Sequence, residues 1–436
     1  MRTAAIVAAV LAAAFLPGHP VGLSAFLVAA VLGIALWHAG ISRRRAFLYG
    51  VPALALVATC VIRDATWIVL IDIAFAWVLA AVAVSGPNLT AFLAPFARLV
   101  ETPTLAPPLP SGSSAAIRGT VLGGLLVVPF GALFWTADAA FAELGQQVPL
   151  PEPISLPGRV LAFVVVLGVG VGLCLAVRNP FPVIDVRAPV RLGFLEWVIP
   201  LTLLNALFAA FVIVQFAVLF GGHDHVLETA GLTYSEYAHQ GFWQLVAAAA
   251  LTLTVVGAAL LCTKPDGRRQ RILRDALLGM LCLFTLVVLA SALRRLDVYE
   301  EAYGLSRLRL AVDSFVSWLG GLFVLVLAAG IARPVRRHFA ETVLLGSAAA
   351  LLGLSLASPD RVIAGRNIDR WRETGKLDVG YLGELSADAA PAIAELPPSL
   401  KELALVPQTA RLADPEPWFS YNFSRAHARS VLNAGT

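Results

Sequence analysis

Charged residues are scarce in this sequence. Asp, Glu, Lys and Arg together make up 14% of its 436 residues, whereas soluble domains carry roughly 25%. Hydrophobic residues reach 58%, and a core that hid so much apolar surface from water would be unusual. The composition argues against an ordinary water-soluble protein and predicts one that is solvated by lipid.

Cysteines are few and far apart. The four of them, Cys60, Cys174, Cys262 and Cys282, lie within or at the ends of apolar runs. No two have the short spacing of a zinc site, and we expect no disulfide framework. They are interpreted as small apolar residues in helices.

Several sequence motifs of catalysis are absent. The chain has no Gly-x-x-x-x-Gly-Lys-Ser/Thr phosphate loop, no Gly-x-Ser-x-Gly elbow and no His-Glu-x-x-His pair. We therefore expect neither ATP hydrolysis on this chain nor a cofactor. The net charge of +4 needs no nucleic-acid partner, because the basic residues cluster in loops, where membrane orientation explains them.

Apolar runs of ~20 residues predict about eleven membrane spans. Because lipid offers the backbone no hydrogen bonds, the predicted fold is an all-α polytopic transmembrane helix bundle. The expected spans are 4–16, 21–37, 46–62, 65–84, 119–135, 159–177, 196–220, 241–262, 275–293, 308–331 and 339–357. The first run also resembles a signal peptide, but the second span follows at once and favours a helical hairpin.

Alternate loops carry most of the basic residues. Three of them, around 43–45, 264–274 and 333–337, are rich in arginine, whereas 136–157 has no Lys or Arg. The positive-inside rule then predicts a cytoplasmic N-terminus and an external C-terminal tail. The exception is the predicted external segment 294–309, which holds four arginines and three acidic residues, so part of its charge can be paired.

The pattern divides the chain into four parts. These are N-terminal transmembrane helices (1–84), an interfacial helix with a Pro/Ser linker (85–118), a transmembrane core (119–357) and a soluble helical tail (358–436). In the tail, Ser358-Pro359-Asp360 predicts a helix start capped by the Ser358 hydroxyl, and Gly375 predicts its end. The tail is short for an independent core, so we expect a small helical module against the membrane surface.

Asp72 lies in the middle of the span 65–84. A carboxylate in hydrocarbon is costly and commonly marks a proton or ion path. The structural alternative is a carboxylate that pairs with an arginine or a hydroxyl, or one that stays protonated because burial raises its pKa. Both interpretations remain open.

Another group of polar residues begins the span 308–331. Asp313 follows Arg309 by four positions, so both lie on one helix face. A polar cavity lining is one interpretation, and a local ion pair is the favoured one. Together, Arg307 and Arg309 can hold a lipid phosphate or another anion, or extend to the membrane interface.

The predicted external loop before residue 241 holds two weaker candidates. His223 and His225 are able to bind a metal, but at this spacing only from an extended loop, so a hydrated polar loop is favoured and no metal site is predicted. Glu236, between Tyr234 and Tyr237, suits acid–base chemistry. An interfacial aromatic belt explains the two tyrosines more simply.

Three stretches of the chain carry a resemblance. Tyr234-Ser235-Glu236-Tyr237-Ala238-His239-Gln240-Gly241-Phe242 has the form Tyr-x-Glu-Tyr-Ala-x-x-Gly-Phe. Tyr303-Gly304-Leu305-Ser306-Arg307-Leu308-Arg309 is similar to Tyr-Gly-Leu-Thr-Arg-x-Arg, with Ser306 keeping the hydroxyl. The third runs from Asn367-Ile368 through Asp378 and Tyr381-Leu382 to Ser386-Ala387-Asp388-Ala389 and Pro391. The patterns resemble a bacterial membrane family called domain of unknown function 4173, whose relative is domain 4153.

The resemblance covers about the last half of the chain. It implies a multi-pass inner-membrane protein of uncharacterised activity, so no catalytic residue follows from it. It draws attention to the motif residues without giving them roles: Tyr234, Glu236, Tyr237, Gly241, Tyr303, Gly304, Arg307 and Arg309.

The favoured function is a non-catalytic one in the cell envelope, either sensing, scaffolding or assembly. The three motif stretches would share one external surface, with the lipid bilayer and other envelope proteins as partners. One alternative is a proton-coupled secondary transporter that uses Asp72, although no inverted repeat is visible. A third class is an enzyme acting on envelope lipid or glycan, with Glu236 or His239 as base and the two arginines holding a phosphate.

Overall fold

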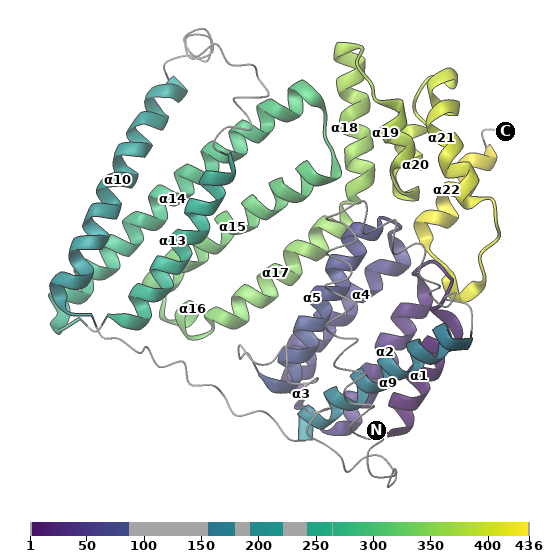
Figure 1. The fold of residues 1–436 in the computed structure, drawn as a ribbon, viewed down its shortest axis with the longest axis horizontal. Helices are drawn as coiled ribbons and strands as arrows, with labels where there is room; N and C mark the ends of the chain where they lie inside the picture. The colour runs from purple at the N-terminus through teal and green to yellow at the C-terminus, as the bar shows by residue number, and fades with distance from the viewer. Residues whose placement is uncertain (1, 87–155, 179–191, 221–241, 264, 435–436) are drawn as a thin grey trace. The chain divides into compact units, whose positions relative to one another are not determined.

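The computed structural model describes residues 2–86, 156–178, 192–220, 242–263 and 265–434 (Figure 1). The chain divides into two compact units. Unit 1 contains Met1–Ile184 and Asp414–Ala426, and unit 2 contains Asp185–Ala413 and His427–Thr436. The tail expected as one module thus contributes to both units. The predicted interfacial helix, the Pro/Ser linker and the predicted span 119–135 lie outside the described residues.

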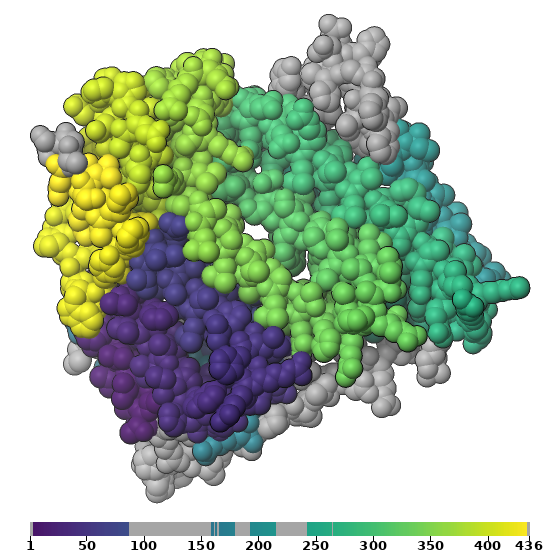
Figure 2. Space-filling view, turned by 180° about the vertical axis from the view of Figure 1, so that it is seen from behind, coloured from purple at the N-terminus to yellow at the C-terminus, as the bar shows by residue number. Residues whose placement is uncertain are grey.

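Unit 1 is a bundle of apolar helices, whose described surface is coloured mainly purple and blue in Figure 2. Helices α2 and α4 are joined through the short helix α3 (Arg43–Arg45) and the π-helical turn η1 (Ala46–Gly50). The longer helices are α1 (Arg2–Phe15), α2 (Leu23–Ala39), α4 (Val51–Ile62), α5 (Thr66–Ser85) and α9 (Leu156–Arg178).

Small residues allow α1 to approach its neighbours closely. It contacts α9 and α2, and four of its alanines at helical spacing, Ala5, Ala8, Ala9 and Ala12, are buried. Packing through small side chains is the usual way in which helices associate without a hydrophobic driving force. The helix that contains residues 4–15 therefore packs against α2, which is the arrangement expected of the first helix of a hairpin.

Unit 2 contains the remaining apolar helices. Helix α14 contacts α10, α13 and α15, and α15 also contacts α17. Asn205 of α10 donates a 3.2 Å hydrogen bond to the Leu277 carbonyl of α14, which is the interhelical bond expected of a polar residue in a span. The bounds are α10 (Phe194–Phe220), α13 (Phe242–Cys262), α14 (Gly267–Tyr303), α15 (Arg307–Ile331), α16 (Arg333–Arg337) and α17 (Phe339–Leu356).

Helix α14 is much longer than the span predicted at 275–293. Its 37 residues extend ~55 Å at 1.5 Å per residue, whereas the hydrocarbon core is only ~30 Å thick. The segment Arg294–Tyr303, expected as part of a loop, is helical, so α14 is longer than the hydrocarbon core requires. The last residue of this segment, Tyr303, is the first residue of the Tyr303–Arg309 motif, which forms the turn to α15.

A helical module follows α17 and packs on that turn. Its core contains Ile363, Leu382 and Ile393 together with Leu305 and Leu310 from the turn, so it is built on the membrane helices rather than separate from them. Its elements are α18 (Pro359–Thr374), α19 (Val379–Glu384), η2 (Ala387–Ala389), α20 (Ala390–Ile393) and α21 (Pro398–Leu412). The chain ends with η3 (Trp418–Ser420) and α22 (Phe423–Ala434).

Both ends of α18 were predicted, but its cap was not predicted correctly. The helix begins at Pro359, and Gly375 ends it in the left-handed conformation with φ +71°. The expected cap at Ser358 does not form, because that residue has φ 59° and its side chain makes no capping hydrogen bond.

The described residues form an all-α polytopic bundle, as predicted. Eight of their helices are long and apolar enough to cross a membrane, and α1 and α2 are shorter apolar helices. They correspond to ten of the expected spans, and the remaining one, 119–135, is the one outside the described residues.

Each unit has an arginine-rich segment at one end. In unit 1 it is α3, while the turns α1–α2 and α4–α5 lie at the other end, where Arg63 and Arg425 also lie. In unit 2 the arginines at the start of α14 and in α16 lie opposite the α14–α15 turn, and that turn carries the arginines of segment 294–309.

Candidate functional site at the α14–α15 turn

The Tyr303–Arg309 motif forms a tight turn between two long helices. Gly304 ends α14 with φ +79°, a conformation that glycine adopts without strain. A side chain at this position would also collide with the amide oxygen of Asn367. Ser306 then caps α15 by accepting a hydrogen bond from the Arg309 backbone N–H at 3.4 Å, so the retained hydroxyl has a structural role.

Arg307 forms an ion pair with a buried carboxylate of the helical module, that of Asp360. Its guanidinium donates from Nε to Oδ1 of Asp360 at 3.1 Å and from an Nη to Oδ2 at 2.5 Å. Asp360 is completely buried and also accepts from the backbone N–H of Ser386 at 2.8 Å. This two-point pairing has the geometry in which an arginine–carboxylate bond is strongest.

Tyr381 adds a second contact to the same residue. Its hydroxyl accepts a 2.8 Å hydrogen bond from the Arg307 backbone N–H, which is one of the orphan donors at the start of α15. Burial raises the pKa of the Tyr381 phenol despite the nearby arginine. The hydroxyl therefore stays protonated at neutral pH.

Two side chains of α18 bind the backbone of the turn. Asn367 donates to the Leu305 carbonyl at 2.8 Å and accepts from the Leu305 N–H at 2.9 Å. Arg370 donates to the carbonyls of Glu301 and Ala302. These carbonyls belong to the last turn of α14, where no helical N–H is available to them. The third motif stretch thus caps the helix that the second motif stretch ends.

A cavity of about 210 Å³ lies between the turn and the module. Three cationic side chains line it, those of Arg309, Arg370 and Lys376, together with one carboxylate, Asp378. Asp378 accepts from the backbone N–H of Tyr381 at 2.9 Å and so caps α19. The three cationic side chains give the cavity the chemistry to hold a small anion.

The ion pair expected between Arg309 and Asp313 is absent, although the structure describes both residues. Arg309 turns back, donates to the Gly304 carbonyl and lies 4.2 Å from the centre of the Tyr299 ring. One helix turn is the right spacing for a pair, but the Arg309 guanidinium contacts the Gly304 carbonyl and the Tyr299 ring instead. A nearby pair that does form joins Arg366 to Glu300 at 3.5 Å.

Asp72 is located elsewhere, inside unit 1. Its side chain is completely buried, and its Oδ2 lies 2.7 Å from the Thr59 hydroxyl. That hydroxyl is also 2.6 Å from the Leu56 carbonyl. The bond joins α4 to α5 and matches the structural alternative, in which the carboxylate pairs with a hydroxyl.

Unit 1 contains a second capping site that sequence reasoning did not find. Asn422 donates to the carbonyls of Cys60 and Arg63, at 2.9 and 2.8 Å, and Ser424 donates to that of Ile62 at 2.8 Å. These are carbonyls at the end of α4. No local pattern marks these side chains, since their partners lie more than 350 positions away.

Arg425 forms two ion pairs beside this second capping site. Arg425 is buried and pairs with Asp64 at 2.8 Å and with Glu416 at 2.6 Å. Residues of the tail thus use the same device twice, once in each unit. In each unit, an arginine–carboxylate pair with one fully or nearly fully buried partner, Asp360 in unit 2 and Arg425 in unit 1, accompanies side chains that cap the end of a membrane helix.

The other predicted candidates lie outside the described residues. They are Tyr234, Glu236, Tyr237, Gly241, His223 and His225. Within the described residues, no group of three or more His, Cys, Asp or Glu side chains is placed to hold a metal ion.

A family model described as "Domain of unknown function (DUF4153)" matches residues 4–396. The chain belongs to the DUF4153 family. The motif resemblance had put domain 4173 first and domain 4153 as its relative, and the matching model is the relative. No curated protein and no solved structure matches the chain. For this DUF4153 member the matched range includes the α14–α15 turn and the α18 and α19 residues that bind it, but ends before the capping residues of unit 1.

Proposed function

We propose that this DUF4153 protein is a non-catalytic scaffold of the bacterial inner membrane. Its membrane helices hold a helical module at one membrane face, where the module senses or assembles other envelope components. The observation that carries the proposal is the way the motif residues are used. Arg307, Asn367 and Arg370 bind groups of the protein itself.

The chemistry of these contacts favours attachment over catalysis. A catalytic arginine must be available to substrate, whereas the Arg307 guanidinium is bound to a buried carboxylate. The Ser306 hydroxyl is engaged as a helix cap. What the motif supplies is a fixed junction between two membrane helices and a module.

The charge distribution supports an external module. In unit 2 the module packs at the α14–α15 turn, which is opposite the arginines that begin α14. In unit 1 the tail residues Asn422 and Ser424 bind the end of α4, which is opposite the arginines of α3. Arginine-rich loops stay in the cytoplasm, so both observations favour the same side for the tail.

Dependence on protein amount tests the proposal. A scaffold acts in proportion to its partners, whereas an enzyme turns over and works when scarce. In a deletion strain with the gene under a titratable promoter, we expect an envelope phenotype that worsens in step with falling protein level. Full rescue by a small fraction of the normal level would contradict a scaffolding role and favour the enzyme alternative.

Asp72 favours a second candidate, a proton-coupled transporter, because it is a fully buried carboxylate in a membrane helix. Asp72→Asn separates the two functions. Asparagine keeps the size of the side chain and still accepts from Thr59, so a scaffold should remain active, although the buried NH2 group lowers stability by about 1–3 kcal/mol if it finds no acceptor. Loss of complementation with normal folding and amount would favour the transporter. Thr59→Val is the control: it removes the hydrogen bond between α4 and α5 but keeps Asp72, and so shows the effect of losing that bond alone.

A further inference from the structure

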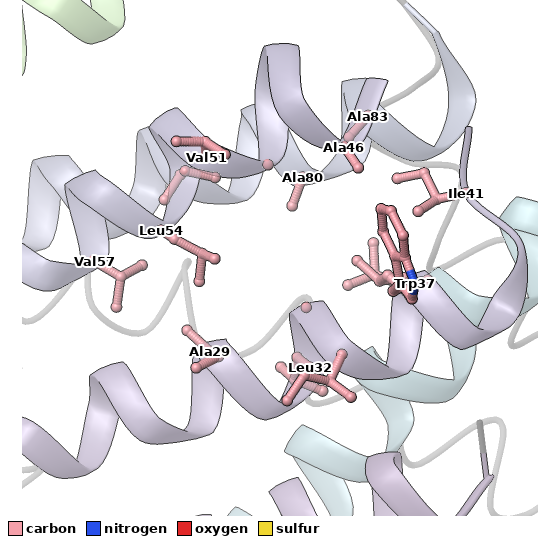
Figure 3. Close-up of a pocket in the computed structure, with 18 of the residues that line it drawn as sticks. Ala29, Leu32, Trp37, Ile41, Ala46, Val51, Leu54, Val57, Ala80 and Ala83 are labelled. Atoms are coloured by element: carbon pink, nitrogen blue, oxygen red, sulfur yellow. The ribbon is translucent and has the colours of Figure 1, made fainter. Parts of the chain in front are cut away.

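Unit 1 contains a large cavity among its membrane helices. It has a volume of about 600 Å³, which is within the ~300–1,000 Å³ range of small-molecule sites. Helices α2, α4, α5 and α9 contribute to its wall, and the turn η1 closes one end. Figure 3 shows Trp37, Ile41 and Ala46 around that end, and Ala29 and Val57 at the other.

The lining of this cavity is apolar. The residues that Figure 3 labels are alanine, valine, leucine, isoleucine and tryptophan. Several lining side chains are also exposed, including Trp37, Phe47 and Val51, so the cavity opens on the flank of the bundle. In a membrane this flank faces hydrocarbon, and an apolar occupant enters without desolvating any polar group.

The dimensions fit one leaflet of a bilayer. Along α2 (Leu23–Ala39) the lining extends from Ala29 to Trp37, which is ~12 Å at 1.5 Å per residue. One leaflet of hydrocarbon is ~15 Å deep, half of the ~30 Å core. On α5 the lining residues begin at Ile73, and on α4 they end at Val57. The cavity is therefore lined by the half of α2, of α4 and of α5 that is nearer to the arginines of α3.

Three arginines lie near one end of the cavity. This is where the headgroup of a lipid would be if its acyl chain occupied the cavity. Arg43, Arg44 and Arg45 separate the lining residues Ile41 and Ala46 along the chain. The Arg45 guanidinium lies 3.4 Å from the Val84 carbonyl, next to the lining residue Ala83. All three arginines are exposed, and guanidinium groups bind phosphate oxygens well.

We propose that unit 1 binds an anionic glycerophospholipid, with one acyl chain in this cavity and its phosphate on Arg43–Arg45. The lipid would come from the leaflet on the side of the arginines. This site is independent of the proposed scaffold function, because it shares no residue with the α14–α15 turn. Unit 1 would then bind anionic lipids in preference to lipids without a net negative charge.

Photochemical labelling of the full-length protein tests this site. The probes are phosphatidylglycerol and phosphatidylcholine with the same diazirine-bearing acyl chain, each at low abundance in phosphatidylcholine nanodiscs. We expect phosphatidylglycerol to label peptides of α2, α4 and α5 several-fold more than phosphatidylcholine does. Equal labelling by the two probes, or labelling spread evenly over all the helices, would overturn the proposal.

Filling the cavity supplies a matched comparison. Gly50 lines it, and a Cβ there meets no atom within 4 Å, so Gly50→Leu inserts a side chain without a backbone clash. Gly346 of α17 is exposed and equally open, and Gly346→Leu is the control. Labelling should fall several-fold in Gly50→Leu and in Ala80→Leu, a second filling variant, but not in the control. Unchanged labelling in both filling variants would show that the probe binds elsewhere.

The arginines are tested separately on purified, folded protein, so that altered insertion does not confuse the result. Arg43→Gln combined with Arg45→Gln should make labelling by the two probes equal. Arg333→Gln combined with Arg336→Gln removes two charges from another basic end and should leave the preference intact. If the preference survives the first pair of changes, the phosphate does not bind these arginines.

Discussion

Arg307 is the residue on which most of the motif contacts depend. Its side chain satisfies the buried Asp360, and its backbone N–H binds Tyr381. A buried carboxylate without its partner is costly because the protein interior cannot solvate the charge. The same reasoning explains why nearby arginines with exposed partners matter less.

Arg307→Gln should lower the free energy of unfolding of the module by about 3 kcal/mol. Arg372→Gln removes an arginine whose ion pairs with Asp369 and Glu395 are exposed and should cost less than about 1 kcal/mol. Urea-dependent proteolysis of the two purified variants measures the difference. Equal stability would mean that the buried pair contributes nothing beyond an exposed one.

Gly304 and Gly375 both have positive φ, but Gly304 is the more constrained position. Its ψ of 171° is in a region that essentially only glycine adopts, whereas Gly375, with ψ 2°, is in the ordinary left-handed region. A Cβ at Gly304 would in addition meet Asn367. Gly375→Ala should therefore cost about 1 kcal/mol and Gly304→Ala about 2–3 kcal/mol. Thermal unfolding of both variants checks this order, and the opposite order would contradict the tighter constraint at Gly304.

The ends of α4 and α14 show how the tail stabilises membrane helices. Each helix leaves carbonyls without helical partners, and each is capped by side chains from a distant part of the chain. A loop near the membrane surface has limited access to water, so protein donors are worth more there than at a soluble helix end. The capping side chains therefore join elements rather than merely covering them.

Asn422→Ala should expose this effect in unit 1. It leaves the Cys60 and Arg63 carbonyls without these donors, at a cost of about 2 kcal/mol, and loosens the end of α4. The Cys60 thiol is buried, so maleimide should modify it faster in the variant. Thr409→Ala, whose hydroxyl bonds only within its own helix, is the control. An unchanged rate at Cys60 would show that Asn422 does not hold α4.

The distribution of arginine predicts how the protein sits in a membrane. Fusions of alkaline phosphatase or green fluorescent protein after Thr436 should give phosphatase activity without fluorescence. Fusions after Arg337 should give fluorescence without phosphatase activity, because that basic segment is expected to stay in the cytoplasm. Fluorescence after Thr436 would place the tail in the cytoplasm and change the kind of partner that it meets.

A second measurement addresses the shared external surface. Single cysteines at Glu236 and at the exposed Tyr303, in a protein whose native cysteines are replaced, are labelled with a membrane-impermeant maleimide in intact cells. Labelling of both is expected. If the two positions react from opposite sides, the motif stretches do not form one surface.

Much of the architecture was predictable because hydropathy and helical period are local properties. The apolar runs predicted ten helices that the structure describes, and Gly375 marked the end of α18. The motif pattern also pointed to Gly304 and Arg307. The capping at Ser358 and the pairing of Arg309 with Asp313 were wrong, since spacing along a helix does not specify which of several neighbours a flexible side chain meets.

The amino-acid sequence alone was enough to establish a multi-pass helical membrane protein, because lipid leaves long apolar runs no other backbone structure. Tertiary structure was needed to assign partners to the polar residues. Arg307 and Asp360 are 53 positions apart, and Asn422 and Cys60 are 362 apart. Pairings over such distances depend on how the chain packs, and packing is where buried polar groups find their donors and acceptors.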